Sequence, residues 1–296
     1  MVSFTKTLYK NKLDKNKLDK NKLVTKTNFR KIWLFLIIPL LIVSLSLAQE
    51  PSIDSQSLEK ILVSLATRAD SFERSLPDFV AIETLTQETI QEKDKKLLER
   101  NITVSRLTGR QLQITKKGHT QLDFQEIRQV QTINGKVVKV DRFKPRGPQV
   151  DGNFSSILLS HFASLDQKDF NFSLDNQLHK LRDRTSYLVK FTSRLKVSER
   201  QYYFFEGKRL PSQQEGQAWI DIETLAPLRI EYKETNLPKN IQSIVYSVDY
   251  GTVQLGEESF LLPLEATSEI QEKKFINRVE QQYSDYKKFS TDVKLE

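Results

Sequence analysis

The residues that could do chemistry in this chain are few, and their spacing matches no catalytic or metal-binding motif. The histidines are His119, His161 and His179, and no two have the spacing of a metal site. The chain has no cysteine, which excludes disulfides, thiolate ligands and a lipidated N-terminal cysteine. It also has no Gly-rich phosphate loop and no Gly-x-Ser-x-Gly elbow. The sequence therefore predicts no catalytic residue, no metal and no cofactor.

Two features of the sequence have a structural interpretation as well as a chemical one. Asp221 and Glu223 flank Ile222 and would share one strand face, where two carboxylates could act as an acid pair. A solvated strand face that runs into a turn at Thr224 explains the same residues more simply. Beside Phe162, His161 is best interpreted as a packed core residue.

Aromatic side chains are the one enrichment that points to binding. Residues 202–205 read Tyr-Tyr-Phe-Phe and would place two aromatics on each face of a strand. We predict that further aromatics lie on neighbouring strands and line a hydrophobic ligand site, the alternative being an ordinary core. The candidate ligand-lining residues are Trp219, Phe204, Tyr232 and Tyr246.

The elements that must position these residues are mostly strands. An amphipathic helix is predicted from Ser52 to Leu76, ended by Pro77, because apolar residues recur every three or four positions. Afterwards the period changes to two, and about a dozen short strands follow. A sheet of that many strands must curl or close. The fold class predicted is α+β and mainly antiparallel: a curved half-barrel sheet, with the long N-terminal helix and a short helix on its concave face.

Three local features refine this arrangement. Asn134-Gly135 is a strong signal for a type I′ hairpin turn. A second turn is predicted at Thr108-Gly109, between strands 102–107 and 110–116. The short helix is predicted over residues 153–163.

An export signal precedes this domain. Basic Arg30-Lys31 are followed by an apolar run from Ile32 to Val43 and by small residues up to Ala48. We predict cleavage after Ala48; the alternative is that residues 32–48 stay uncleaved as an inner-membrane anchor. Either outcome makes residues 1–48 a basic leader and residues 49–296 a single half-barrel domain, in the periplasm or elsewhere outside the cytoplasm.

The leader also accounts for the charge of the chain. The formal net charge is +8, but residues 1–48 hold ten of the 46 Lys/Arg and two of the 38 Asp/Glu. The remainder carries 36 residues of each sign and is formally neutral. The charge of residues 49–296 therefore gives no reason to expect a nucleic-acid partner.

Two strand motifs resemble a known family. Residues 216–221 read Gly-Gln-Ala-Trp-Ile-Asp and residues 227–231 read Pro-Leu-Arg-Ile-Glu. This pairing resembles exported bacterial proteins of the outer-membrane lipoprotein-sorting (LolA-like) type. Residues 248–253, Leu262-Pro263 and 283–289 resemble an uncharacterised branch of it, as do residues 76–79 and 152–154. The resemblance implies a half-barrel with helices across its open face and a hydrophobic cavity, and it brings no catalytic residues.

The function expected is therefore binding rather than catalysis. The first hypothesis is an exported, non-enzymatic protein that binds a lipid or other hydrophobic ligand, with a role in lipid or lipoprotein transfer. The alternative is an envelope interaction module whose cavity is filled by its own side chains. A hydrolase that uses scattered carboxylates is the least favoured, since it would need two acids with opposed pKa shifts in one cleft.

Overall fold

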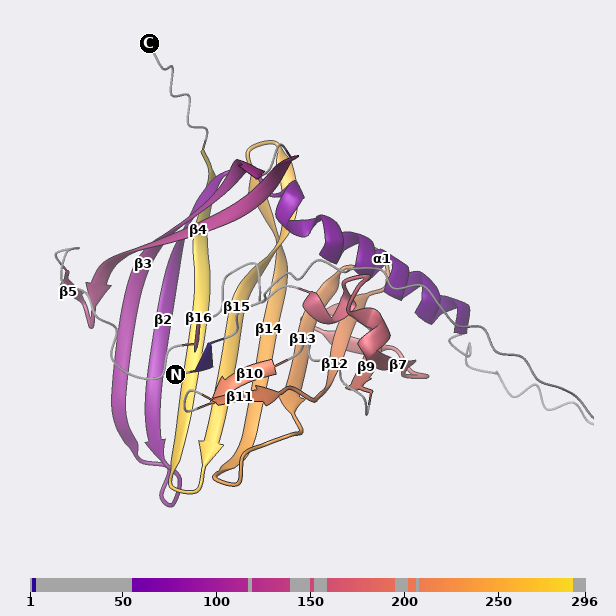
Figure 1. The fold of residues 1–296 in the computed structure, drawn as a ribbon. Helices are drawn as coiled ribbons and strands as arrows, with labels where there is room; N and C mark the ends of the chain where they lie inside the picture. Colours follow the sequence, from indigo (N-terminus) through magenta and orange to yellow (C-terminus); the bar gives the residue numbers. More distant parts are fainter. Residues whose placement is uncertain are drawn as a thin grey trace, which may run out of the picture. The chain divides into compact units, whose positions relative to one another are not determined.

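A curved antiparallel sheet with one long helix across it makes up the described part of the chain (Figure 1). The computed structural model describes residues 2–3, 55–116, 119–138, 150–151, 159–194, 202–205 and 208–289. The described elements belong to one compact unit, which spans Ile53–Glu296 together with Met1–Thr5. Residues 6–52, which hold most of the predicted leader (residues 1–48) and its cleavage site, lie outside the described residues.

The sheet has twelve strands in the order β5-β4-β3-β2-β16-β15-β14-β13-β12-β9-β7, with β8 paired to β9. All of its pairings are antiparallel, and the described strands at its two ends, β5 and β7, do not pair with each other. The strands are β2 (Phe79–Gln91), β3 (Leu97–Lys116), β4 (His119–Ile133), β5 (Lys136–Val137), β7 (Phe170–Leu174), β8 (His179–Leu181), β9 (Arg184–Ser193), β12 (Gln214–Asp221), β13 (Pro227–Glu234), β14 (Ile241–Leu255), β15 (Glu258–Glu272) and β16 (Phe275–Lys288). The predicted class, mainly antiparallel with an open curved sheet, is confirmed at this level.

Two small sheets share no strand pairing with the large one, although Leu210 of one of them packs against the cluster of Ile241, Ile244 and Tyr246 on the large sheet. Strand β10 (Tyr202–Phe205) pairs with β11 (Lys208–Pro211), and β1 (Val2–Ser3) pairs in parallel with β6 (Val150–Asp151). The prediction that the aromatic strand neighbours the strands of Trp219 and Tyr232 is therefore wrong, because β10 pairs with β11 alone among the described strands.

Helix α1 (Ser55–Ser75) lies across the open side of the sheet, where it contacts β4 near one edge and β7 at the other (Figure 1). Its apolar stripe is buried, with Ile61 and Leu65 at its centre, and Pro77 follows its last turn. Polar contacts fix its position: Arg68 donates to the carbonyl of Thr224 at 2.8 Å, and Ser164 donates to the carboxylate of Asp70.

A short segment lies beside α1 on the same side of the sheet. It contains the 3₁₀ turns η2 (Ser160–Phe162) and η3 (Gln167–Asp169). Of the short helix predicted over residues 153–163, residues 153–158 lie outside the described part, and η2 is what the structure shows of the rest. The side chain of Gln167 donates to the carbonyl of Leu62 at 2.8 Å and so ties this segment to α1.

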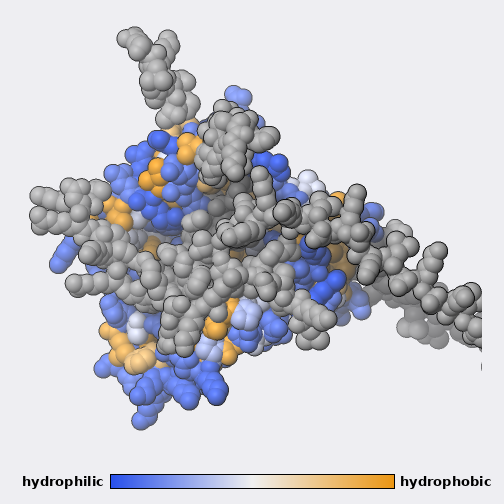
Figure 2. Space-filling view, viewed as in Figure 1, coloured by the Kyte–Doolittle hydropathy of each residue, from blue (hydrophilic) through white to orange (hydrophobic). Residues whose placement is uncertain are grey.

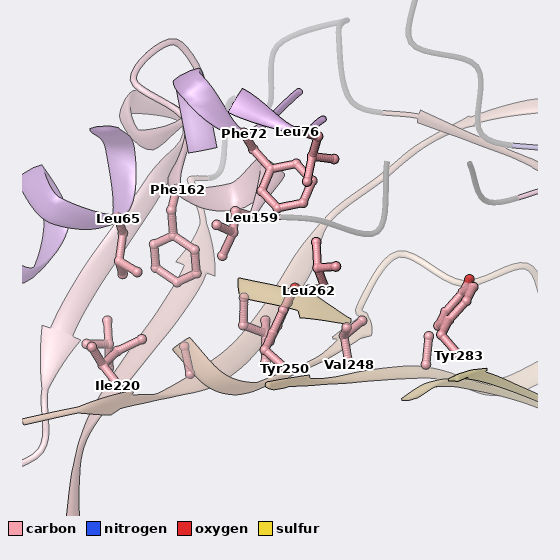
Figure 3. Packing of buried hydrophobic residues seen from close by; sticks show 14 of the residues in the cluster. Leu65, Phe72, Leu76, Leu159, Phe162, Ile220, Val248, Tyr250, Leu262 and Tyr283 are labelled. Atoms are coloured by element: carbon pink, nitrogen blue, oxygen red, sulfur yellow. The ribbon is translucent and has the colours of Figure 1, made fainter. Parts of the chain in front are cut away.

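The main core lies between α1, η2 and the sheet. Figure 3 shows Leu65 and Phe72 of the helix, and Leu76 directly after it, pointing toward the sheet, with Phe162 and Leu159 from the η2 segment beside them. The sheet residues that receive them include Ile220, Val248, Tyr250 and Leu262. We call the sheet face that carries these residues the inner face.

One predicted turn is confirmed and the other is wrong. Asn134 and Gly135 both have positive φ, 48° and 75°, as a type I′ turn requires. Strand β3 instead runs unbroken through Thr108-Gly109. Gly109 is there for packing: a Cβ at this position would lie 2.6 Å from the rings of Phe79 and Phe124, so only glycine leaves them room.

Candidate ligand-binding face

One row of residues crosses the inner face beside the main core. Register pairs join Tyr232 to Tyr246, Tyr246 to Ser268, Ser268 to Val279 and Val279 to Gln87. Residues directly opposite one another share a face, so all five side chains lie on the inner face. We call them the inner row. Four of them are buried and Tyr232 is half-buried.

The main core ends next to this row. Val248 and Ala266 belong to the main core, and each lies two residues along its strand from Tyr246 or Ser268, which do not. Tyr246 is part of a second, smaller apolar cluster together with Ile241 and Ile244. The apolar lining of the inner face thus continues past the residues packed against α1.

A buried polar group lies at the β13 end of the inner row. The carboxylate of Glu234, 2% exposed, accepts hydrogen bonds from Gln214 Nε2 at 2.7 Å and from Ser212 Oγ at 2.8 Å. Gln214 Oε1 in turn lies 2.8 Å from His161 Nε2. Burial raises the pKa of Glu234, and the hydrogen bonds from Gln214 and Ser212 offset only part of that rise.

The side chain of His161 is part of this polar group, and its ring packs in the core. Its imidazole is buried among Phe170, Phe191 and Tyr232, with ring centroids 5.3, 4.8 and 4.6 Å away. The hydroxyl of Ser212 donates to Glu234, so these residues do not present a serine activated by histidine. Among the described residues no group of three or more His, Cys, Asp or Glu could hold a metal ion.

A second buried polar group joins β2 and β4, with Glu83 four residues along β2 from Gln87 of the row. Arg128 Nε donates to both carboxylate oxygens of Glu83, at 2.8 and 3.0 Å, and Nη1 donates to Glu126 at 3.2 Å. Burial would lower the pKa of Arg128, but the charge and hydrogen bonds of Glu83 outweigh it, and the net pKa is raised. Burial also raises the pKa of Tyr283, which pairs with Glu83 across β16 and β2.

The structure brings two of the four predicted ligand-lining residues together. The rings of Tyr232 and Tyr246 stack with centroids 4.8 Å apart. Trp219 lies on the opposite face, because Gly216 is the residue of β12 that pairs with Tyr232, and Trp219 is three positions further along. Phe204 lies in β10, and its side chain lies outside the described part. Binding of a ligand by these residues stays a prediction.

The carboxylate pair of β12 is not solvated as predicted. Glu223 is exposed, but Asp221 is only 2% exposed. Its Oδ1 accepts hydrogen bonds from the backbone N–H and the hydroxyl of Thr224, at 2.9 and 2.8 Å, and Arg184 pairs with Oδ2 at 2.8 Å. Burial acts to raise the pKa of Asp221, yet these bonds lower it overall. Asp221 therefore stabilises the β12–β13 turn, and it forms no acid pair with Glu223.

Of the other two histidines, His179 lies 3.7 Å from Asp175, and the side chain of His119 lies outside the described residues. Sequence reasoning missed both buried polar groups. A signal was present for Glu83, since it alternates in phase with Phe79 and Ala81 and must share their buried face.

Within the described residues, no helix is both long and apolar enough to cross a bilayer. No protein-family model matches the chain, and no curated protein matches it.

Among solved structures, a DUF1329 family protein from Desulfovibrio piger ATCC 29098 is similar, with a TM-score of 0.39 and 12% identity over 80% of this chain and 94% of that chain. A domain from Vibrio parahaemolyticus assigned to outer membrane lipoprotein sorting has a TM-score of 0.37 and 13% identity over 80% and 95% of the two chains. The second carries the name of the type that the strand motifs resemble. Because both TM-scores lie below 0.5, the description of this chain as an open, curved antiparallel sheet rests on its own strand order.

Proposed function

We propose that this chain is an extracytoplasmic, non-enzymatic protein that binds a lipid or other hydrophobic ligand against the inner row of its half-barrel sheet. The inner row supports this proposal because it offers stacked aromatic rings at one end, a small serine in the middle and a valine beside it. The predicted leader is the reason for placing the protein outside the cytoplasm. We infer that it takes part in lipid or lipoprotein transfer by binding such a ligand.

The energetics of such a site are favourable. Burial of an acyl chain is worth about 0.8 kcal/mol per methylene, so about eight methylenes would contribute about 6 kcal/mol before the costs of ordering. The carboxylate of Glu234, two residues from Tyr232 on β13, lies next to the row, where it could accept a hydrogen bond from the polar part of an amphiphile. The ligand class that fits best is therefore an amphiphile with an apolar tail.

A specific observation favours the second candidate, an envelope interaction module. Side chains from α1 and η2 already fill part of the inner face (Figure 3). Two carboxylates, Glu83 and Glu234, are also buried on that face. A self-filled core with buried charge is what an interaction module would show. The two functions differ in whether the inner row has an external occupant.

Lipid mass spectrometry on the gently purified full chain tests the proposal. We expect a stoichiometric lipid with the wild type and its loss in Ser268→Phe, which fills the middle of the row. Thr267→Phe is the matched control, since it adds the same ring on the other face of the same strand. Circular dichroism of each variant checks folding, and Ser268→Leu, a smaller side chain that still fills part of the row, replaces Ser268→Phe if the latter does not fold. A folded wild type without lipid, or equal lipid in both Phe variants, would refute the proposal and favour the interaction module.

A further inference from the structure

Three turns meet at one end of the sheet, the lower end in Figure 1. They are the β2–β3 turn (residues 92–96), the β13–β14 turn (235–240) and the β15–β16 turn (273–274). The first and third are joined by a backbone hydrogen bond of 2.8 Å from Glu92 to the carbonyl of Lys274. We call this set of turns, together with the adjoining residues 97, 98, 272 and 275, the lysine end.

Basic residues outnumber acidic ones at the lysine end. Six exposed lysines lie there, against three acids, although the chain after Ala48 carries equal numbers of each sign. The lysines are Lys93, Lys95, Lys96, Lys239, Lys273 and Lys274, and the acids are Glu92, Asp94 and Glu272. The positive charge is therefore a local feature of this end.

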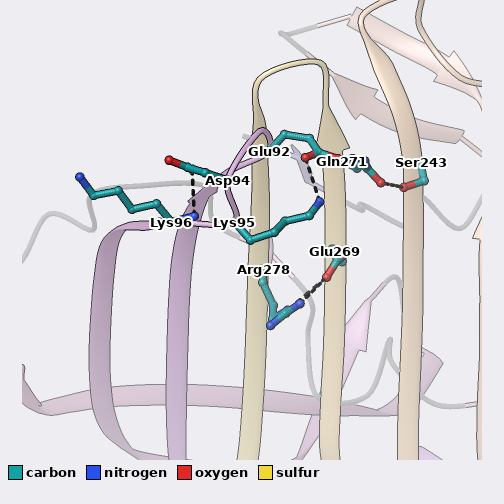
Figure 4. A network of polar contacts seen from close by, with 8 residues as sticks. All are labelled: Glu92, Asp94, Lys95, Lys96, Ser243, Glu269, Gln271 and Arg278. Atoms are coloured by element: carbon teal, nitrogen blue, oxygen red, sulfur yellow. Dashed lines mark hydrogen bonds and ion pairs between the residues drawn. The ribbon is translucent and has the colours of Figure 1, made fainter.

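The three acids are already engaged within the protein. Glu92 pairs with Lys95 at 2.8 Å and accepts a hydrogen bond from Gln271 at 2.9 Å, and Asp94 accepts one from the backbone of Lys96 (Figure 4). Glu272 accepts one from Asn277 at 3.4 Å. Lys95 is the one lysine of this end with an ion pair among the described residues. The remaining five ammonium groups have no acidic partner there.

Large apolar side chains are exposed among these lysines. The exposed fractions are 46% for Leu97, 47% for Leu98 and 38% for Phe275. Leu97 and Leu98 come directly after the β2–β3 turn, and Phe275 comes directly after the β15–β16 turn. Figure 2 shows hydrophobic surface beside hydrophilic surface at this lower end. Exposed apolar groups ringed by basic ones are the pattern of a surface that rests on anionic lipid, since the apolar groups enter the headgroup layer while the lysines meet its charge.

A hollow between the turns adds a place for a headgroup. It has a volume of ≈ 570 Å³, and its lining includes Lys93, Lys273, Lys274 and one acid, Glu92. Because Glu92 already pairs with Lys95 and Gln271, the three lysines give this hollow an excess of positive charge, which suits a phosphate group. The same end thus combines charge, apolar contact and a recess.

We propose that the lysine end docks on the surface of an anionic lipid bilayer, with Leu97, Leu98 and Phe275 in the headgroup layer and the lysines on lipid phosphates. This goes beyond the proposed binding of a ligand to the inner row. It uses different residues, so either proposal can fail without the other.

A local fluorescent probe tests this docking in the full chain. The natural absence of cysteine allows one label in a clean background, at Asn240→Cys in the β13–β14 turn, with Glu257→Cys in the β14–β15 turn as control. The two turns lie at opposite ends, because Ile241 pairs with Glu272 and Leu255 with Glu258. With phosphatidylglycerol vesicles we expect the emission of an environment-sensitive dye to shift to the blue at residue 240 and not at 257, and neither to shift with phosphatidylcholine vesicles.

Charge-removing variants then identify the residues responsible. Each basic residue near an anionic surface is worth about 1 kcal/mol, a factor of about five, so K93Q/K273Q/K274Q should weaken the probe-detected association about 100-fold. The matched control K60Q/K180Q/K287Q removes the same charge from exposed lysines elsewhere and should leave it unchanged. Raising the salt to about 1 M should suppress the shift, because the Debye length falls to about 3 Å. An equal shift at 240 and 257, equal loss in both triple variants, or a shift with inorganic phosphate alone would overturn the proposal.

Discussion

Two glycines of the sheet that look alike in the sequence should respond very differently to alanine. A Cβ at Gly216 would lie 2.3 Å from the carbonyl oxygen of Glu231, 2.6 Å from the ring of Phe191 and 2.7 Å from Cβ of Tyr232. The three heavy atoms nearest to a Cβ at Gly251 would all belong to the side chain of Leu264, with Cδ1 at 2.5 Å and Cγ at 3.0 Å. Leu264 can change rotamer, whereas the carbonyl oxygen belongs to the paired strand β13 and can move only if the ladder moves.

The magnitudes follow from this difference. Overpacking a closed site costs about 1–3 kcal/mol, and at Gly216 we expect about 3 kcal/mol because backbone must shift. At Gly251 the rotamer change of Leu264 costs about 0.5–1.5 kcal/mol. At both sites alanine offsets about 0.4–1 kcal/mol by restricting the unfolded chain, so the net loss should be about 2 kcal/mol or more at Gly216 and below about 1 kcal/mol at Gly251.

Urea unfolding followed by far-UV circular dichroism measures both variants against the wild type. The denaturant slopes should be unchanged, so that midpoints report stability directly. Losses for Gly216→Ala and Gly251→Ala that agree within about 0.5 kcal/mol would refute the reasoning, since this is the usual scatter between independent measurements of this kind. That outcome would mean that β12 and β13 yield freely near Gly216, and that the close packing of Phe191 and Tyr232 does not constrain the inner row.

Three further predictions concern the buried charges and are read by the same unfolding assay. Arg128→Met leaves the carboxylate of Glu83 buried without its cation and should cost about 3–5 kcal/mol, of which E83Q/R128M should recover at least half; no recovery would mean that Arg128 acts by packing. For Glu234, burial raises the folded-state pKa above the ordinary 4.5, so its stabilising contribution is complete below that value and is lost as the pH rises through the folded pKa. The stability of the wild type relative to Glu234→Gln should therefore fall as the pH rises from about 4.5 through the folded-state pKa, and a constant difference would contradict the assignment. Asp221→Ala removes the acceptor of two Thr224 hydrogen bonds and should cost about 1–2 kcal/mol, while Glu223→Ala, exposed in the same turn, should cost less than about 0.5 kcal/mol.

Features that depend on neighbouring residues could be read from the sequence. The alternation of period two predicted most strands of the large sheet and their antiparallel class, because it reflects one buried and one exposed face within a single strand. Asn134-Gly135 predicted a type I′ turn because few residue types accept positive φ at two successive positions. The in-phase position of Glu83 with Phe79 held the information that this carboxylate is buried.

Features that depend on partners far along the chain needed the tertiary structure. Gly109 reads as a turn residue until Phe79 and Phe124 are known to pack against it from two other strands. The separation of Trp219 from Tyr232 depends on the register of β12 with β13, since a shift of one residue would exchange the faces.

The candidate site shows the same division. The sequence by itself determined that Tyr232 and Tyr246 are aromatic residues on strands, whereas their stacking depends on the register of β13 with β14. Only the tertiary structure decided that Arg128 meets Glu83, 45 residues away, and that Gln214 joins His161 to Glu234. Periodicity is a local property of the chain, while pairing between distant segments is selected by the burial and hydrogen bonding of the whole fold, which no short window of sequence contains.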